Sequence, residues 1–205
     1  MKSVLFLTLT LAALISSTPA WAMRFALVGA ANMSEPKVAG TEYTAKNGFG
    51  YGALLEFGIV PFFTMEMGAL KLARNYEYGA VVPTISSTEA KMKMIEFPVV
   101  FKAYLGHALS LGIGGYYAKY QGDISYEKTD AFGVKSITSQ SLRAANHSES
   151  DYGLVTSLGL YFPLAPLTRI MVDGRYTLGI KDNNIGAGTT TYNDLQLLAG
   201  IRFSF

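Results

Sequence analysis

The chain closes on the stretch Leu195-Gln196-Leu197-Leu198-Ala199-Gly200-Ile201-Arg202-Phe203-Ser204-Phe205. Apolar side chains occupy every second position of this stretch, and mostly polar or small residues lie between them. Successive side chains of a β-strand point to opposite faces, so this alternation predicts a strand with two different faces. The apolar face consists of Leu195, Leu197, Ala199, Ile201, Phe203 and Phe205.

Upstream of this stretch, the same alternation recurs in seven more segments, which predicts an all-β chain with eight strands. Strand lengths of roughly 9 to 14 residues suit tilted strands that cross a membrane, and they exceed the roughly 5–6 residues usual in soluble sandwiches. No spanning helix is expected, because Gly or Pro interrupts the longest uncharged stretches. The expected strands cover residues 24–33, 48–59, 62–72, 92–105, 107–120, 152–162, 169–180 and 192–205.

The composition excludes several classes of protein. Half of the residues are hydrophobic and 16% are charged, whereas an average soluble domain has about 25% charged residues. The chain has no Cys, which excludes a disulfide scaffold and a Cys-based metal or redox site. The formal net charge of +2 provides no basic field, so no nucleic-acid partner is expected.

A secretory signal peptide is predicted for residues 1–22. Lys2 gives a positive start, Val4–Ile15 is apolar, and Ala20 and Ala22 place small residues where cleavage after Ala22 requires them. Residues 23–205 are then expected to form a single domain.

The connections between the expected strands alternate in length. The short ones are Val60-Pro61, Gly106 and 164–166, and the long, polar ones are 34–47, 73–91, 121–151 and 181–191. Outer-membrane barrels have short periplasmic turns and longer external loops. With an even number of strands, both termini are therefore expected in the periplasm, and residues 121–151 are expected to form a mobile loop that projects from the cell.

The faces opposite the apolar rows are expected to carry five acidic and five basic side chains. The interior of an eight-stranded barrel is just wide enough for side chains to fill it, so ion pairs are expected to close the lumen. The alternative is a soluble barrel with these charges outside, but the nearly uncharged apolar faces favour lipid contact. The expected lumen residues are Arg24, Glu56, Glu66, Glu96, Lys102, Arg169, Asp173, Arg175, Asp194 and Arg202.

Aromatic residues near the strand ends predict a girdle at each membrane interface. The outer girdle is expected to contain Phe49, Tyr51, Tyr76, Tyr78, Tyr117, Tyr120, Tyr152, Tyr176 and Tyr192. The periplasmic girdle is expected to contain Phe62, Phe63, Tyr104, Phe162, Phe203 and Phe205.

The chain resembles the small eight-stranded bacterial outer-membrane barrels, such as outer membrane protein X and the membrane domain of outer membrane protein A. The resemblance rests above all on the last strand, which alternates and closes on a terminal Phe. It implies an antiparallel up-and-down transmembrane barrel in the outer membrane of a Gram-negative bacterium, in contact with outer-membrane lipid and lipopolysaccharide. It also implies that the barrel-assembly machinery reads Leu197, Ala199, Ile201, Phe203 and Phe205.

Candidate chemistry in the sequence is sparse. The Gly-rich run 47–52 leads into a strand, whereas a phosphate loop leads into a helix. Some outer-membrane barrels modify lipid A with His, Ser and an acid at the outer rim, but His147, Ser148 and Glu149 are adjacent in one loop, which is not a positioned triad. His107 is expected in a solvated turn. No catalytic residue, cofactor or metal site is predicted.

Three functions remain open at this point. The leading hypothesis is a structural or surface-interaction barrel with a filled lumen, whose long loops meet an extracellular ligand. The second is a small-solute channel of the porin type, and an open path through the lumen would favour it. The third is a lipid A-modifying enzyme, which His147 packed against an acid and a Ser would favour.

Overall fold

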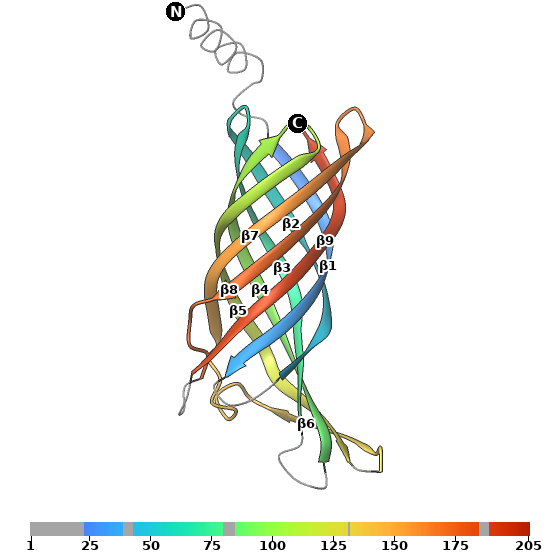
Figure 1. The fold of residues 1–205 in the computed structure, drawn as a ribbon, viewed down its shortest axis with the longest axis vertical. Helices are drawn as coiled ribbons and strands as arrows, with labels where there is room; N and C mark the ends of the chain where they lie inside the picture. Colours follow the sequence, from blue (N-terminus) through green and yellow to red (C-terminus); the bar gives the residue numbers. More distant parts are fainter. Residues whose placement is uncertain (1–22, 39–42, 80–84, 131, 185–188) are drawn as a thin grey trace, which may run out of the picture.

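The computed structural model describes residues 23–38, 43–79, 85–130, 132–184 and 189–205, most of which form strands (Figure 1). Residues 1–22, predicted as the signal peptide, lie outside the described residues. Among the described residues, no helix is long and apolar enough to cross a membrane. The strands are β1 Met23–Val38, β2 Tyr43–Val60, β3 Phe63–Gly79, β4 Ile85–Leu105, β5 Leu109–Asp130, β6 Lys135–Gln140, β7 Ser150–Ala165, β8 Thr168–Gly179 and β9 Thr190–Ser204.

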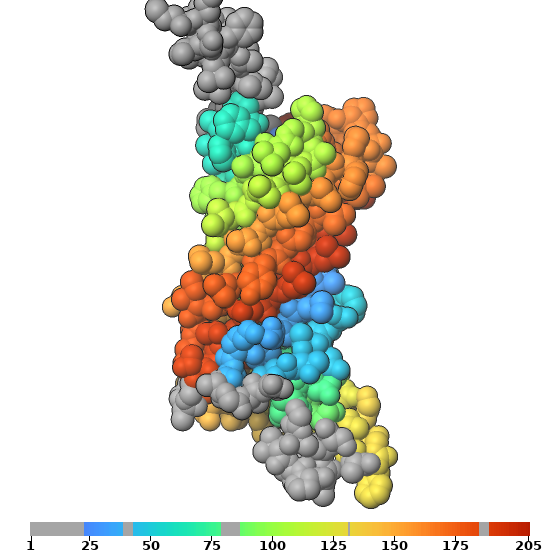
Figure 2. Space-filling view, viewed as in Figure 1, coloured from blue at the N-terminus to red at the C-terminus, as the bar shows by residue number. Residues whose placement is uncertain are grey.

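Eight of these strands close into one ring of antiparallel neighbours, which confirms the predicted barrel. β1 pairs with β9 from Arg24 opposite Ser204 to Val38 opposite Thr190, so the first and last strands seal the sheet. The ring also closes between β4 and β5, while the short β6 pairs only with the far end of β5. The strands are tilted, and their side chains form diagonal bands around the outer surface (Figure 2).

The short turns lie at the end of the barrel that holds the C-terminus and the start of β1 (Figure 1). Their positions agree with the sequence prediction, and Gly106 adopts a φ of 70° in one of them, a conformation that glycine tolerates best. At the opposite end the strands are longer than predicted. β5 continues to Asp130, and β6 returns beside it from Lys135 to Gln140.

The predicted strand end at residue 120 is therefore wrong, while the mobility expected of residues 121–151 stays a prediction. The first part of this segment is a β-hairpin that extends beyond the ring (Figure 1). Its last part turns back, and the backbone N–H of Ser148 donates to the carbonyl of Asn183. Hydrogen bonds between neighbouring strands hold these polar residues in the sheet. The segment has no alternating apolar pattern, so its sequence does not predict these strands.

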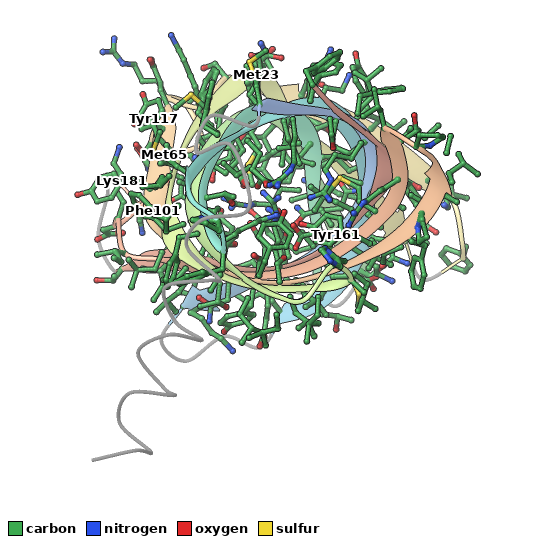
Figure 3. The ribbon with its side chains drawn as sticks, turned by 90° about the horizontal axis from the view of Figure 1, so that it is seen from above. Met23, Met65, Phe101, Tyr117, Tyr161 and Lys181 are labelled. Carbon is green, nitrogen blue, oxygen red and sulfur yellow. The ribbon has the colours of Figure 1, made fainter. Side chains whose placement is uncertain are left out.

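The outer wall is apolar. Phe101 and Tyr117 point away from the barrel axis in the view along it, whereas Tyr161 points inward (Figure 3). Exposure follows the same division, with Phe101 52% and Tyr161 1% exposed. The predicted assembly row on β9 also faces outward, and its role as an assembly signal stays a prediction. The exposed members of that row are Leu197, Ala199, Ile201 and Phe205, and Phe203 is half-buried.

Candidate functional site in the barrel interior and its outer mouth

The interior contains a dense set of charged side chains. Eight of the ten predicted lumen residues are at most 4% exposed, while Arg24 and Arg169 are only partly buried at the end that carries the short turns. Inward-pointing nitrogen and oxygen atoms gather inside the ring (Figure 3). The buried eight are Glu56, Glu66, Glu96, Lys102, Asp173, Arg175, Asp194 and Arg202.

The basal group lies next to the short turns and joins four strands. Glu56 on β2 forms ion pairs with Arg24 on β1 and with Arg202 on β9. The hydroxyl of Tyr104 on β4 donates to Glu56 Oε2 at 2.6 Å and accepts from Arg202 Nη1 at 2.6 Å. The guanidinium of Arg202 also lies 3.9 Å from the ring centroid of Tyr161. This end of the lumen is therefore crossed by hydrogen-bonded side chains.

A neutral square of charges forms the central group. Lys102 Nζ lies 2.7 Å from Glu66 Oε2 and 2.6 Å from Asp173 Oδ2. Arg175 Nη2 reaches the same two carboxylates, at 2.5 Å and 3.1 Å. All four side chains are at most 3% exposed. Two cations and two anions from three strands therefore neutralise one another across the barrel.

Glu96 differs from the other lumen carboxylates. Its Oε2 accepts from Gln196 Nε2 at 2.9 Å, and no cation of the described residues forms an ion pair with it, although the side chain is fully buried. Balanced numbers of acids and bases predict an ion pair for each lumen carboxylate. This prediction is wrong for Glu96, whose partner is a neutral amide.

The upper group contains two residues that the sequence analysis did not assign to the lumen. Arg74 on β3 and Asp151 on β7 are fully buried, and Arg74 Nη1 lies 2.9 Å from Asp151 Oδ2. Arg74 Nη2 lies 2.5 Å from Asp194 Oδ2 on β9, and Nη1 also donates to the Tyr120 hydroxyl. Counting by twos from Glu66 along β3 would have reached Arg74, so the signal was present in the sequence.

Several tyrosines predicted for the girdles lie inside the barrel instead. Tyr76, Tyr120 and Tyr192 are at most 8% exposed, and Tyr104 and Tyr78 pack against the interior cluster. The reason is strand phase, because each of these residues lies an even number of positions from an inward-facing residue of its strand. Members of the outer girdle that do face outward are Phe49, Tyr51, Tyr117, Tyr152 and Tyr176.

His147 closes the outer end of the interior. Its Nδ1 lies 2.7 Å from the carbonyl oxygen of Ser148, which can only accept, so Nδ1 carries the proton. In the neutral ring, Nε2 then accepts from the Tyr192 hydroxyl at 2.9 Å. Burial is the largest effect on this imidazole and lowers the pKa of His147 below its ordinary value. The ring therefore acts as a neutral bridge between the loop and β9.

A pocket of about 140 Å³ opens above His147. Four tyrosines, Tyr43, Tyr76, Tyr126 and Tyr192, line it together with His147 and with aliphatic, small and amide side chains of the mouth. We call this pocket the tyrosine cup. Its lining comes from β1, β2, β3, β5 and β9 and from the two neighbouring loops.

The geometry around His147 does not assemble a catalytic triad. Both ring nitrogens are engaged by Tyr192 and by a backbone carbonyl, and the Ser148 hydroxyl donates to the carbonyl of Ser150. The part of the chain that the structure describes contains no group of His, Cys, Asp or Glu that could hold a metal ion. His107 lies exposed in its turn.

Comparison with known proteins identifies the type of barrel. Residues 6–203 match the family model of the outer membrane protein beta-barrel domain. The outer membrane protein OprG from Pseudomonas aeruginosa is similar in structure, with a TM-score of 0.58, 13% identity and coverage of 91% of this chain and 96% of that chain. At this identity the likeness concerns the fold alone.

Two other solved structures are similar with lower TM-scores. Ail, the attachment invasion locus protein of Yersinia pestis, gives a TM-score of 0.47 with 15% identity and coverage of 88% of this chain and 99% of that chain. Neisserial surface protein A gives 0.45 with 14% identity and coverage of 88% and 97%. No curated protein sequence matches the chain.

Proposed function

The chain belongs to the outer membrane protein beta-barrel domain family, and from this premise we propose that it is a closed barrel with a surface-interaction role. Its own side chains block the lumen, and its longer end meets partners outside the cell. In this orientation the termini and the short turns lie in the periplasm. The barrel-assembly machinery would insert it, as for other barrels of this kind.

The observation that carries the proposal is the burial of charged side chains at successive levels of the interior. Lys102, Arg175, Glu96 and Arg74 are at most 1% exposed, and they come from the central group, the Glu96 level and the upper group. A water-filled path would expose at least one side of such residues to solvent. The groups also bind one another across the barrel, so each level blocks the lumen with ion pairs or hydrogen bonds.

The outer wall supports contact with outer-leaflet lipid. Lys71 and Lys119 both lie opposite Ile95, so β3, β4 and β5 carry them in one row, and Lys93 lies in the next row outward. All three lysines are exposed, and no carboxylate among the described residues pairs with them. Lys71 also pairs in register with the exposed Tyr51. Lysines beside an interfacial aromatic suit the phosphates of lipopolysaccharide.

Conductance of the purified barrel in planar bilayers tests the closed lumen. We expect no sustained current from the wild type, and a leak from Arg175→Ala and Arg74→Ala, because each removes a cation that binds two carboxylates across the barrel. Leu197→Ile on the outer wall is the matched control and should stay silent. A steady, ion-selective wild-type current would overturn the proposal and favour the channel alternative.

A further inference from the structure

The tyrosine cup has the construction of an aromatic cage. Tyr43 and Tyr76 have ring centroids 5.6 Å apart and planes at 78°, and Tyr43 and Tyr78 have centroids 5.9 Å apart and planes at 62°. Tyr76 in turn lies 6.0 Å from Tyr192, with the ring planes at 43°. Rings from β2, β3 and β9 therefore border one small space, and Tyr126 from β5 also lines it.

Several hydrogen-bonding groups of the lining are occupied by the protein itself. Both ring nitrogens of His147 are engaged. The Asn183 amide nitrogen donates to Asp151 Oδ1 at 3.0 Å and to the carbonyl oxygen of Lys181 at 3.1 Å, which uses both of its protons. The cup therefore offers a ligand aromatic surface more than polar groups. This disfavours a sugar ring, whose hydroxyls need partners once they are buried.

The described residues that line the cup carry no charged side chain. Burial lowers the pKa of His147, which favours its neutral ring. Beneath the cup, Arg74 faces both Asp151 and Asp194 and lies 4.4 Å from the Tyr192 ring centroid, so a buried ion-paired group forms the floor of the cup. The described lining therefore offers an anion no cationic partner, whereas aromatic ring faces attract a cation.

We propose that the tyrosine cup binds an organic cation with a quaternary ammonium head, of the choline or tetramethylammonium type. Such a head group needs no hydrogen-bond partner and is attracted to the faces of aromatic rings. The volume of about 140 Å³ is close to the roughly 150 Å³ of a cavity that admits one benzene ring. The cup is therefore large enough for one quaternary ammonium head group. The proposal deepens the proposed surface-interaction role, from which it takes the outward orientation of the cup.

Binding of choline to the full-length barrel tests the proposal. The barrel is purified in tetraethylene glycol octyl ether, because detergents with amine oxide or phosphocholine heads would compete for the cup. Affinity is measured by NMR chemical shifts of labelled tyrosine rings. The decisive comparison is between choline and 3,3-dimethylbutan-1-ol, which has the same shape without the charge. We expect saturable shifts of Tyr43 and Tyr126 with choline, and binding of the neutral isostere at least roughly tenfold weaker.

Substitutions in the half-buried part of the cup complete the test. Tyr43→Leu and Tyr126→Leu should each weaken choline binding roughly fivefold, and Tyr43→Phe should retain it because the ring remains. Tyr51→Leu on the outer wall is the matched control. Heat-modifiable migration in electrophoresis shows that each variant folds, and if one leucine variant fails, the other and the isostere comparison still decide.

Three outcomes would overturn the proposal. They are equal affinity for choline and its isostere, preference for methyl glucoside or phenol over choline, and choline binding that survives both leucine substitutions. Conductance measurements address the closed lumen separately. A conducting barrel that binds choline in the cup would refute the proposed function alone, and a silent barrel without choline affinity would refute the cup alone.

Discussion

Removing Lys102 should be among the most damaging single changes in the barrel. Its ammonium group binds Glu66 at 2.7 Å and Asp173 at 2.6 Å, and it is fully buried. In Lys102→Met, Arg175 alone remains to neutralise both carboxylates, which leaves one excess negative charge away from water. Breaking a buried ion pair by removing one partner costs about 3–5 kcal/mol. We therefore expect the free energy of unfolding to fall by about that amount.

The compensating double variant separates charge balance from packing. Lys102→Met combined with Glu66→Gln leaves Arg175 opposite Asp173, which are 3.1 Å apart, so the central group is neutral again. The double variant should recover at least half of the loss caused by Lys102→Met. Urea unfolding in lipid vesicles, followed by heat-modifiable electrophoresis and circular dichroism, measures each free energy.

A surface lysine provides the control. Lys37 pairs with Glu35, and both side chains are about half exposed, at 50% and 51%. An exposed pair of this kind contributes about 0–1 kcal/mol, so Lys37→Met should be nearly neutral. If Lys102→Met were equally mild, or if the effects of the two lumen substitutions simply added, the central square would not hold the barrel together as described here.

Three further outcomes are expected. Because burial lowers the pKa of His147 below 6.5, the unfolded chain binds the proton more readily, so stability should be full above pH 6.5 and fall as the pH drops below it. Urea midpoints between about pH 5 and pH 8 measure this, and His147→Phe should flatten the profile. Gly200→Ala should lower the free energy of unfolding by about 1–3 kcal/mol, since its Cβ would lie 2.0 Å from the Leu27 carbonyl oxygen. Gly174→Ala should be milder, because its Cβ meets only an ordinary contact at 4.0 Å. Urea unfolding that ranks the two variants equally would contradict this. Neutralising Lys71, Lys93 and Lys119 to Gln should weaken retention of bisphosphorylated lipid A in native mass spectrometry, with no change for dephosphorylated lipid, and loss of both lipids alike would argue against a phosphate contact.

The strand count and the direction of the alternation could be read from the sequence, because lipid contact imposes an apolar residue at every second position. Which residues face the lumen near the outer ends of the strands could not be predicted in the same way. One row of β3 faces inward and consists of Glu66, Leu70, Leu72 and Arg74. Because two of these residues are leucines, the sequence pattern of this row resembles that of a lipid-facing row. Leu70 and Leu72 belong to the same buried apolar cluster as Tyr120 and Tyr192, so apolar side chains are accommodated in the upper lumen. The rule that polar residues face the interior therefore fails where side chains fill the barrel.

The order of the charged groups along the axis bears on whether the barrel can transport what it binds. The basal group has Arg24 and Arg202 against Glu56, an excess of one positive charge. The central square is neutral, and the upper group has one excess negative charge. A cation bound in the tyrosine cup would have to disrupt two ion-paired groups beyond it and then approach a positive end. In a low-dielectric interior each of these steps is costly. The charge order therefore favours retention of a cation at the outer mouth over its passage to the other end.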